Sequence, residues 1–215
     1  MGYANAVGKK AVKVDGKTIY IHRENDQSNR ELGPKKALVY HWTAGTYEQC
    51  FDAYHFNIIY DKAVNKAHAV KNLNTSQLGQ HLWGRNTGML AISFSAMRGA
   101  VNTTNHQGLY PITDEMISVG AQLGAELCAW YFINPREFLT LPKKQIQGNS
   151  LVTVSGTIKV PTITDHATIA KFDQYSQDRF DVGSYLTKVK EQLLDHYDKL
   201  KADKAKFQYL GIIKD

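Results

Sequence analysis

Histidines are the residues of this chain that could do chemistry, and they are scattered. The sequence holds eight of them, and no two have the spacing of a helical HExxH metal motif. A histidine metal site would therefore be assembled from segments that are distant in the sequence. His41 and His166 are the best candidates, because each follows an apolar run that predicts a strand, and sites are commonly built at strand ends.

Short apolar runs predict the strands that must position these histidines. The run ALVYHW, from Ala37, is apolar with β-branched and aromatic residues, and it predicts a buried strand that ends at His41. Residues 54–60 predict a second strand. Residues 89–96 form an almost unbroken apolar run, which is typical of the middle of a sheet.

Two longer segments have helical periodicity. Residues 113–131 begin with Thr113, a favourable N-cap, and repeat apolar residues at helical spacing. Residues 185–200 place apolar side chains on one face and charged side chains on the other, which predicts a long C-terminal helix.

Two further segments predict β-hairpins. Residues 10–23 alternate around Asp15-Gly16, a favoured two-residue turn, and residues 151–160 alternate around Ser155-Gly156. Strands interleaved with helices predict a single α/β domain with a mixed central β-sheet flanked by α-helices. We divide the chain into an N-terminal extension, a catalytic domain and a C-terminal tail, over residues 1–36, 37–200 and 201–215.

Composition limits the classes of partner. The 215 residues are enough for one sizeable core, and the net charge of +6 is concentrated near the N-terminus, which favours polyanions such as cell-envelope polymers. A solvated basic face that only aids solubility explains the same charge. We expect no nucleic-acid partner, because the chain lacks a phosphate loop, zinc-finger spacing and an RNA-binding aromatic signature. The absence of a long apolar run predicts no membrane insertion and no signal peptide.

Four segments occur in a recognisable order. They are ALVYHWTAG, AYHFNIIYD, HLWGRNTGMLAISF, and TDHATIA followed by DRFDVGSYL, and they span roughly residues 37–187. In this order they resemble the type-2 N-acetylmuramoyl-L-alanine amidases, a family that includes phage lysozyme-like amidases and peptidoglycan recognition proteins. The N-terminal hairpin region, the 142–160 insertion and the C-terminal tail match no part of that pattern.

The resemblance implies a zinc ion held by His41, His166 and Asp181, with the fourth position open to water. Two imidazoles and one carboxylate are a sound set for catalytic zinc. Alternatives remain for each ligand. His41 could be a strand-end histidine bonded to backbone, and Asp181 could be the N-cap of the following helix, a duty for which Ser184 competes. Asp173 and Asp178 are rival carboxylates.

The resemblance also implies roles beside the metal. Tyr54 matches the family's catalytic tyrosine, which can orient water or donate to an oxyanion. Arg179 stands where the family has a lysine, and it can stabilise an oxyanion without shuttling a proton. His81 resembles a histidine that lines the substrate groove. Trp83 and Asn86 could contact glycan or peptide, although an exposed loop predicts the same residue types.

These expectations combine into one hypothesis of function. The chain would be a zinc-dependent hydrolase of the amide bond between N-acetylmuramic acid and L-alanine in bacterial peptidoglycan. A phage endolysin, made in the bacterial cytoplasm without a signal peptide and released to the wall by a separate pore, fits the sequence best. The alternative is a non-catalytic peptidoglycan-binding module, because family members that lack the third ligand bind the wall without cutting it.

Overall fold

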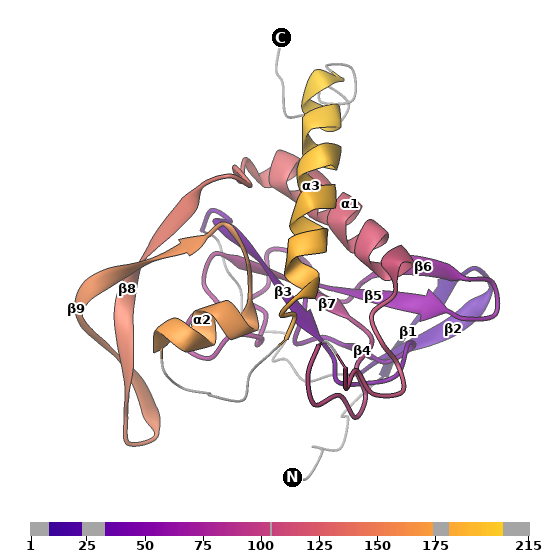
Figure 1. Ribbon diagram of the computed structural model, residues 1–215, viewed down its shortest axis with the longest axis horizontal. Helices are drawn as coiled ribbons and strands as arrows, with labels where there is room; N and C mark the ends of the chain where they lie inside the picture. Colours follow the sequence, from indigo (N-terminus) through magenta and orange to yellow (C-terminus); the bar gives the residue numbers. More distant parts are fainter. Residues whose placement is uncertain (1–8, 23–32, 104, 174–180, 204–215) are drawn as a thin grey trace.

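A five-stranded sheet forms the centre of the protein (Figure 1). The computed structural model describes residues 9–22, 33–103, 105–173 and 181–203. Across the sheet, the strands are β10 (Ile163–Asp165), β3 (Ala37–Trp42), β7 (Met89–Phe94), β5 (Phe56–Asp61) and β6 (Lys66–Lys71). Neighbours run parallel except for the antiparallel β5–β6 pair. The apolar run of β7 therefore lies in the middle of the sheet, as predicted.

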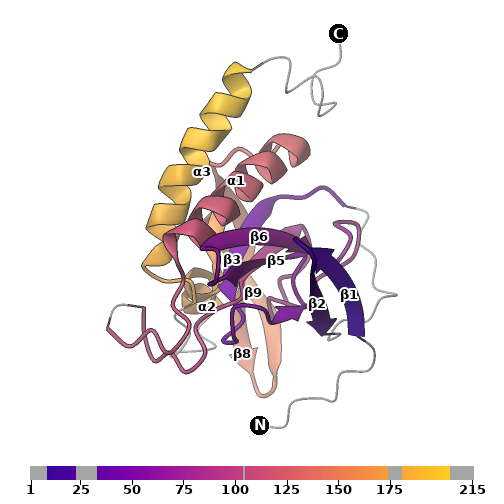
Figure 2. The same cartoon turned by 90° about the vertical axis from the view of Figure 1, so that its right-hand side faces the viewer.

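Two long helices cover one face of this sheet. They are α1 (Asp114–Tyr131) and α3 (Tyr185–Ala202), which pack against each other. The predicted N-cap of α1 is confirmed, because the Thr113 hydroxyl accepts a hydrogen bond from the Met116 amide at 3.2 Å. Figure 2 shows both helices on one side of the sheet and the N-terminal hairpin on the other.

The N-terminal hairpin consists of β1 (Lys9–Val14) and β2 (Lys17–His22), and β2 pairs with the short strand β4 (Cys50–Phe51). Asp15 and Gly16 both have positive φ angles, 45° and 81°, as a tight two-residue turn requires. The hairpin predicted for this region is confirmed. Its buried Ile19 and Ile21 pack with Ile59 of β5, so the hairpin is part of the folded body.

Alternation along β3 decides which side chains reach the site. Leu38 and Tyr40 point into the core under α1 and α3, whereas Val39 packs on the opposite face with Ile169. Because successive side chains of a strand point to opposite faces, His41 belongs to the face of Val39. That face carries α2 (His166–Asp173), which follows β10 directly.

The second predicted hairpin, within residues 151–160, is wrong, because these residues form one continuous strand. β8 (Phe138–Gln147) pairs with β9 (Ser150–Pro161) around Gly148 and Asn149. Ser155-Gly156 lies inside β9, where the register shifts opposite Lys143 and Gly156 has a φ of 100°. The pair that resembles a turn therefore lies at an irregularity of the strand pairing, where a glycine at positive φ is accommodated as it is in a turn. The hairpin extends outward beside α2 (Figure 1).

The fold class is confirmed: a single α/β domain with a mixed sheet, an N-terminal β-hairpin and a long C-terminal helix. Cys50 and Cys128 are both free and buried, and burial raises the pKa of each thiol to about 12. Within the described residues, none of the helices has the length and apolar character that crossing a membrane requires.

Candidate metal centre

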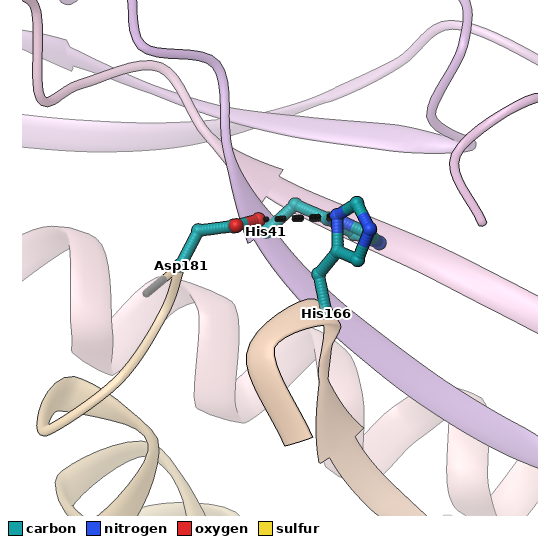
Figure 3. Close-up of side chains that lie close together, drawn as sticks. All are labelled: His41, His166 and Asp181. Carbon is teal, nitrogen blue, oxygen red and sulfur yellow. Dashed lines mark ion pairs between the residues drawn. The ribbon is translucent and has the colours of Figure 1, made fainter. Parts of the chain in front are cut away.

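Three segments bring His41, His166 and Asp181 together (Figure 3). His41 lies near the end of β3, and His166 begins α2 immediately after β10. β10 and β3 are parallel neighbours in which Asp165 pairs with Tyr40, so the next residue of each strand lies at the same edge of the sheet. Asp181 comes from the segment before α3 and points toward both rings.

The distances within this group fit one metal ion. Asp181 Oδ2 lies 3.5 Å from His41 Nδ1 and 3.5 Å from His166 Nδ1. The ligand atoms of all three lie within 4.8 Å of one another. A tetrahedral zinc with bonds near 2.0–2.1 Å separates two ligand atoms by about 3.4 Å. The two measured separations match that value, and all three side chains are at least nine-tenths buried.

Electrostatics favour the protonation states of Asp181 and His41 that a metal needs. Burial alone would raise the pKa of Asp181, but hydrogen bonds from His166 and His41 outweigh it and lower the pKa to about 2. Burial lowers the pKa of His41, and the Asp181 carboxylate offsets only part of this effect. At neutral pH the site therefore offers an ionised carboxylate and a neutral imidazole, as metal ligation requires.

The alternative roles of the ligands are resolved by their contacts. The two ring nitrogens of His41 face the side chains of Asp181 and His81, so this is not a histidine bonded to backbone. The N-cap of α3 is Ser184, not Asp181. Asp173 is engaged elsewhere: both its oxygens accept hydrogen bonds from Arg85. Asp178 and the predicted catalytic Arg179 lie outside the described residues.

Asp165 is a residue of this site that the sequence did not single out. Its Oδ1 accepts a hydrogen bond from the Thr168 amide at 2.8 Å, which caps the start of α2. Its Oδ2 accepts from the amides of Val182 and Gly183, at 3.2 and 3.0 Å. One carboxylate therefore joins the segment that carries His166 to the segment that carries Asp181. Its position directly before His166 was the only available signal.

Tyr54 lies beside the candidate metal ligand His41. Its ring centroid is 5.1 Å from that of His41, and the side chain is half-buried. The residue precedes β5, which begins at Phe56 rather than at the predicted residue 54. A phenol on this turn stands at the border between the buried ligands and solvent, which suits the predicted catalytic role.

The predicted groove residues surround a hollow of about 360 Å³ next to the ligands. It is lined by Gln80, His81, Leu82, Trp83, Gly84, Asn86 and His166. Trp83 is 44% exposed. Asn86 has a structural duty, because its Oδ1 accepts hydrogen bonds from the amides of His81 and Leu82. The binding roles of these residues stay predictions.

His81 lines this hollow but is almost fully buried. It is 6% exposed, and its Nδ1 lies 3.0 Å from His41 Nε2. Burial and the neighbouring histidines hold its pKa well below the usual value. Spacing along the sequence could not predict this contact, because 40 residues separate the two histidines.

No protein-family model matches this chain, and no curated protein matches it. The solved structures that are similar include two of low identity. The Staphylococcus aureus hydrolase AmiA, in complex with its ligand, is 12% identical with a TM-score of 0.46, over 86% of this chain and 85% of that one. The N-acetylmuramyl-L-alanine amidase AmiD from E. coli, in complex with anhydro-N-acetylmuramic acid-L-Ala-D-gamma-Glu-L-Lys, is 18% identical with a TM-score of 0.36, over 58% and 54%. Both likenesses are too remote to carry a functional argument.

Proposed function

We propose that this chain is a zinc-dependent N-acetylmuramoyl-L-alanine amidase of bacterial peptidoglycan. The observation that carries the proposal is the buried group of His41, His166 and Asp181, whose ligand atoms lie within 4.8 Å of one another, with Asp181 3.5 Å from each histidine. Three protein ligands leave a fourth position for water, which is the arrangement of catalytic rather than structural zinc. The presence of the Asp181 carboxylate favours an enzyme over a peptidoglycan-binding module, because such modules lack the third ligand.

Access to the group supports a catalytic role. His166 is both a candidate ligand and part of the lining of the 360 Å³ hollow, so a substrate in the hollow would reach the ligands directly. Trp83 offers an aromatic face at the same hollow, which suits the face of a sugar ring or a peptide plane. The scissile bond would then lie between an exposed binding surface and a buried metal centre.

The residues around the ligands can assist hydrolysis of an amide. Bound zinc would supply an acidified water and a Lewis acid for the carbonyl. Tyr54, beside His41, can donate a hydrogen bond to the oxygen that gains negative charge. Asp165 fixes the backbone after Asp181, which limits movement of that ligand. We assign oxyanion stabilisation to Arg179 as well, through its place two residues before Asp181.

The choice of substrate rests on the four ordered segments that resemble the amidase family. A His-His-Asp group alone fits several hydrolytic reactions, but the segments containing Tyr54 and Trp83 accompany it here in the family's order. We further propose that the enzyme acts as a phage endolysin on the wall. We expect basic residues near the N-terminus to bind anionic wall polymers, and of these Lys36 is exposed, whereas Lys35 is almost fully buried. Lys36 is therefore the better residue to neutralise in a wall-binding assay.

The test is the release of new alanine amino termini from purified peptidoglycan. Wild-type protein should release them, a chelator should stop the release, and added zinc should restore it. His166→Ala should be inactive, whereas His196→Ala, which removes a histidine on α3, should match wild type. New reducing ends without new amino termini would identify a glycosidase instead. Absence of both products would refute the proposal that this protein hydrolyses peptidoglycan.

A further inference from the structure

A histidine pair links the candidate metal ligand His41 to the interior. Nε2 of His41 lies 3.0 Å from Nδ1 of His81, and the two rings meet nearly edge to face, with centroids 5.0 Å apart. Both side chains are buried, at 1% and 6% exposure. A hydrogen bond of this length between buried groups constrains which nitrogen of each ring carries the proton.

The direction of this hydrogen bond follows from the metal site. If Nδ1 of His41 faces the metal, as its position near Asp181 requires, that nitrogen offers its lone pair. The proton of the neutral ring is then on Nε2, which donates to Nδ1 of His81. His81 must in turn carry its own proton on Nε2. Among the described residues that atom has no hydrogen-bond partner.

We propose that His81 is a positioning residue that fixes the tautomer and ring orientation of the metal ligand His41, rather than a residue that binds substrate. The inference rests on the metal site of the proposed function. Metal-bound histidines usually donate their second nitrogen to a carboxylate, a backbone carbonyl or water. Here a neutral imidazole takes that place, so the ligand keeps its orientation without gaining a second negative charge near the metal.

Hydrogen bonds to the backbone of His81 and of its loop hold this residue in place. The Asn86 side chain accepts hydrogen bonds from the amides of His81 and Leu82, and Leu82 is fully buried in the core near Met89. Arg85, in the same loop, is fixed by Asp173 and by the Pro142 carbonyl. This loop is therefore anchored at several points, as a support for a metal ligand must be.

The test compares zinc affinity, by competition with a chromogenic chelator, for wild type, His81→Leu and His81→Asn. Leucine fills the space without an acceptor, whereas the asparagine oxygen can stand near the position of Nδ1. We expect His81→Leu to lose about 10- to 100-fold in affinity, the usual effect of removing such a partner. His81→Asn should regain most of that loss. His196→Leu, remote in the sequence on α3, controls for loss of a histidine.

The outcomes separate this inference from the proposed function. Lower zinc affinity for His81→Leu, with KM for a soluble muramyl peptide unchanged in zinc-saturated protein, supports the positioning role. Unchanged zinc affinity with a raised KM would overturn the positioning role and indicate that His81 binds substrate. Equal losses for the leucine and asparagine variants would also overturn it, because only packing would then matter. If the wild-type protein binds no zinc, both the metal site and this inference are refuted.

Discussion

Asp165 holds the backbone that follows Asp181. Its Oδ2 accepts hydrogen bonds from the amides of Val182 and Gly183, and the Asp181 carbonyl in turn accepts one from the Ala167 amide. The segment carrying the candidate third ligand is thereby tied to the start of α2, where the second ligand lies. The geometry of the site consequently depends on a residue outside the group of His41, His166 and Asp181.

Asp165→Asn should weaken both the fold and the metal site. An amide has one acceptor oxygen, so either the cap of α2 or the pair of amides after Asp181 loses its partner. Hydrogen bonds to charged groups contribute about 1.5–3 kcal/mol each to stability. We therefore expect the free energy of unfolding, measured in urea, to fall by at least about 2 kcal/mol. Zinc affinity should fall in the same variant. The control is Asp195→Asn, which removes only an exposed ion pair with Lys199. If both variants have equally small effects on stability and zinc affinity, the role assigned to the Asp165 hydrogen bonds is contradicted.

Arg85 and Asp173 form a buried ion pair, with both side chains at most 3% exposed. Arg85→Met alone should cost about 3–5 kcal/mol, because it leaves a buried carboxylate without its partner. The double variant Arg85→Met/Asp173→Leu should recover most of that loss, since a hydrophobic pair of similar volume can replace a buried ion pair. Unfolding free energies of the three proteins provide the test. A double variant as unstable as the single one would show that the fold needs the charges themselves.

His55 should make the metal-free protein less stable in acid. Its Nδ1 accepts a hydrogen bond from the Ala91 amide, and its Nε2 lies 3.0 Å from the Gln77 carbonyl. Burial lowers its pKa from 6.5 to about 4, so between these values the unfolded chain binds more protons than the folded one. Stability is therefore full above about pH 6.5, and roughly 3 kcal/mol of it should be lost as pH falls toward 4. Unfolding measured at pH 7 and pH 4.5 should show a smaller decrease for His55→Gln, and equal decreases would contradict the assignment.

Gly124 of α1 allows the helix to approach the sheet. A Cβ at this position would lie 2.1 Å from the Tyr40 hydroxyl and 2.7 Å from Leu193 Cδ1. Gly124→Ala should therefore destabilise the protein by about 1–3 kcal/mol, although alanine is the better helix former. The cost should be smaller in a Tyr40→Phe background, where the closest atom is gone. A cost that is the same in both backgrounds would mean that Leu193, not Tyr40, limits the approach.

Much of the fold could be predicted from local patterns. The apolar run of β7, the cap at Thr113 and the turn at Asp15-Gly16 each have a local physical cause, and each lies where the sequence predicted it. The hairpin predicted within residues 151–160 is wrong, because Ser155-Gly156 suits an irregularity inside one strand, here β9 paired with β8, as well as it suits a turn. Only the pairing of the two strands distinguishes these cases, and pairing is not a local property.

The site was predictable only where an ordered motif supplied long-range information. His41, His166 and Asp181 come together from three segments, and no spacing rule connects them. The contact of His81 with His41, and the hydrogen bonds of Asp165 to the backbone after Asp181, depend on which side of a loop or strand faces the candidate ligands. Such contacts follow from the packing of β3, α2 and the loop before β7, so the sequence alone could not assign them.

The central claim is that His41, His166 and Asp181 hold one zinc ion. The most direct measurement is the zinc content per chain, by mass spectrometry after dialysis, of wild type, Asp181→Asn and Asp195→Asn at matched folded content. We predict about one zinc per chain in wild type and Asp195→Asn, and a large loss in Asp181→Asn, which replaces an anionic ligand by a neutral one. Equal zinc in all three proteins, or none in the wild type, would contradict the account.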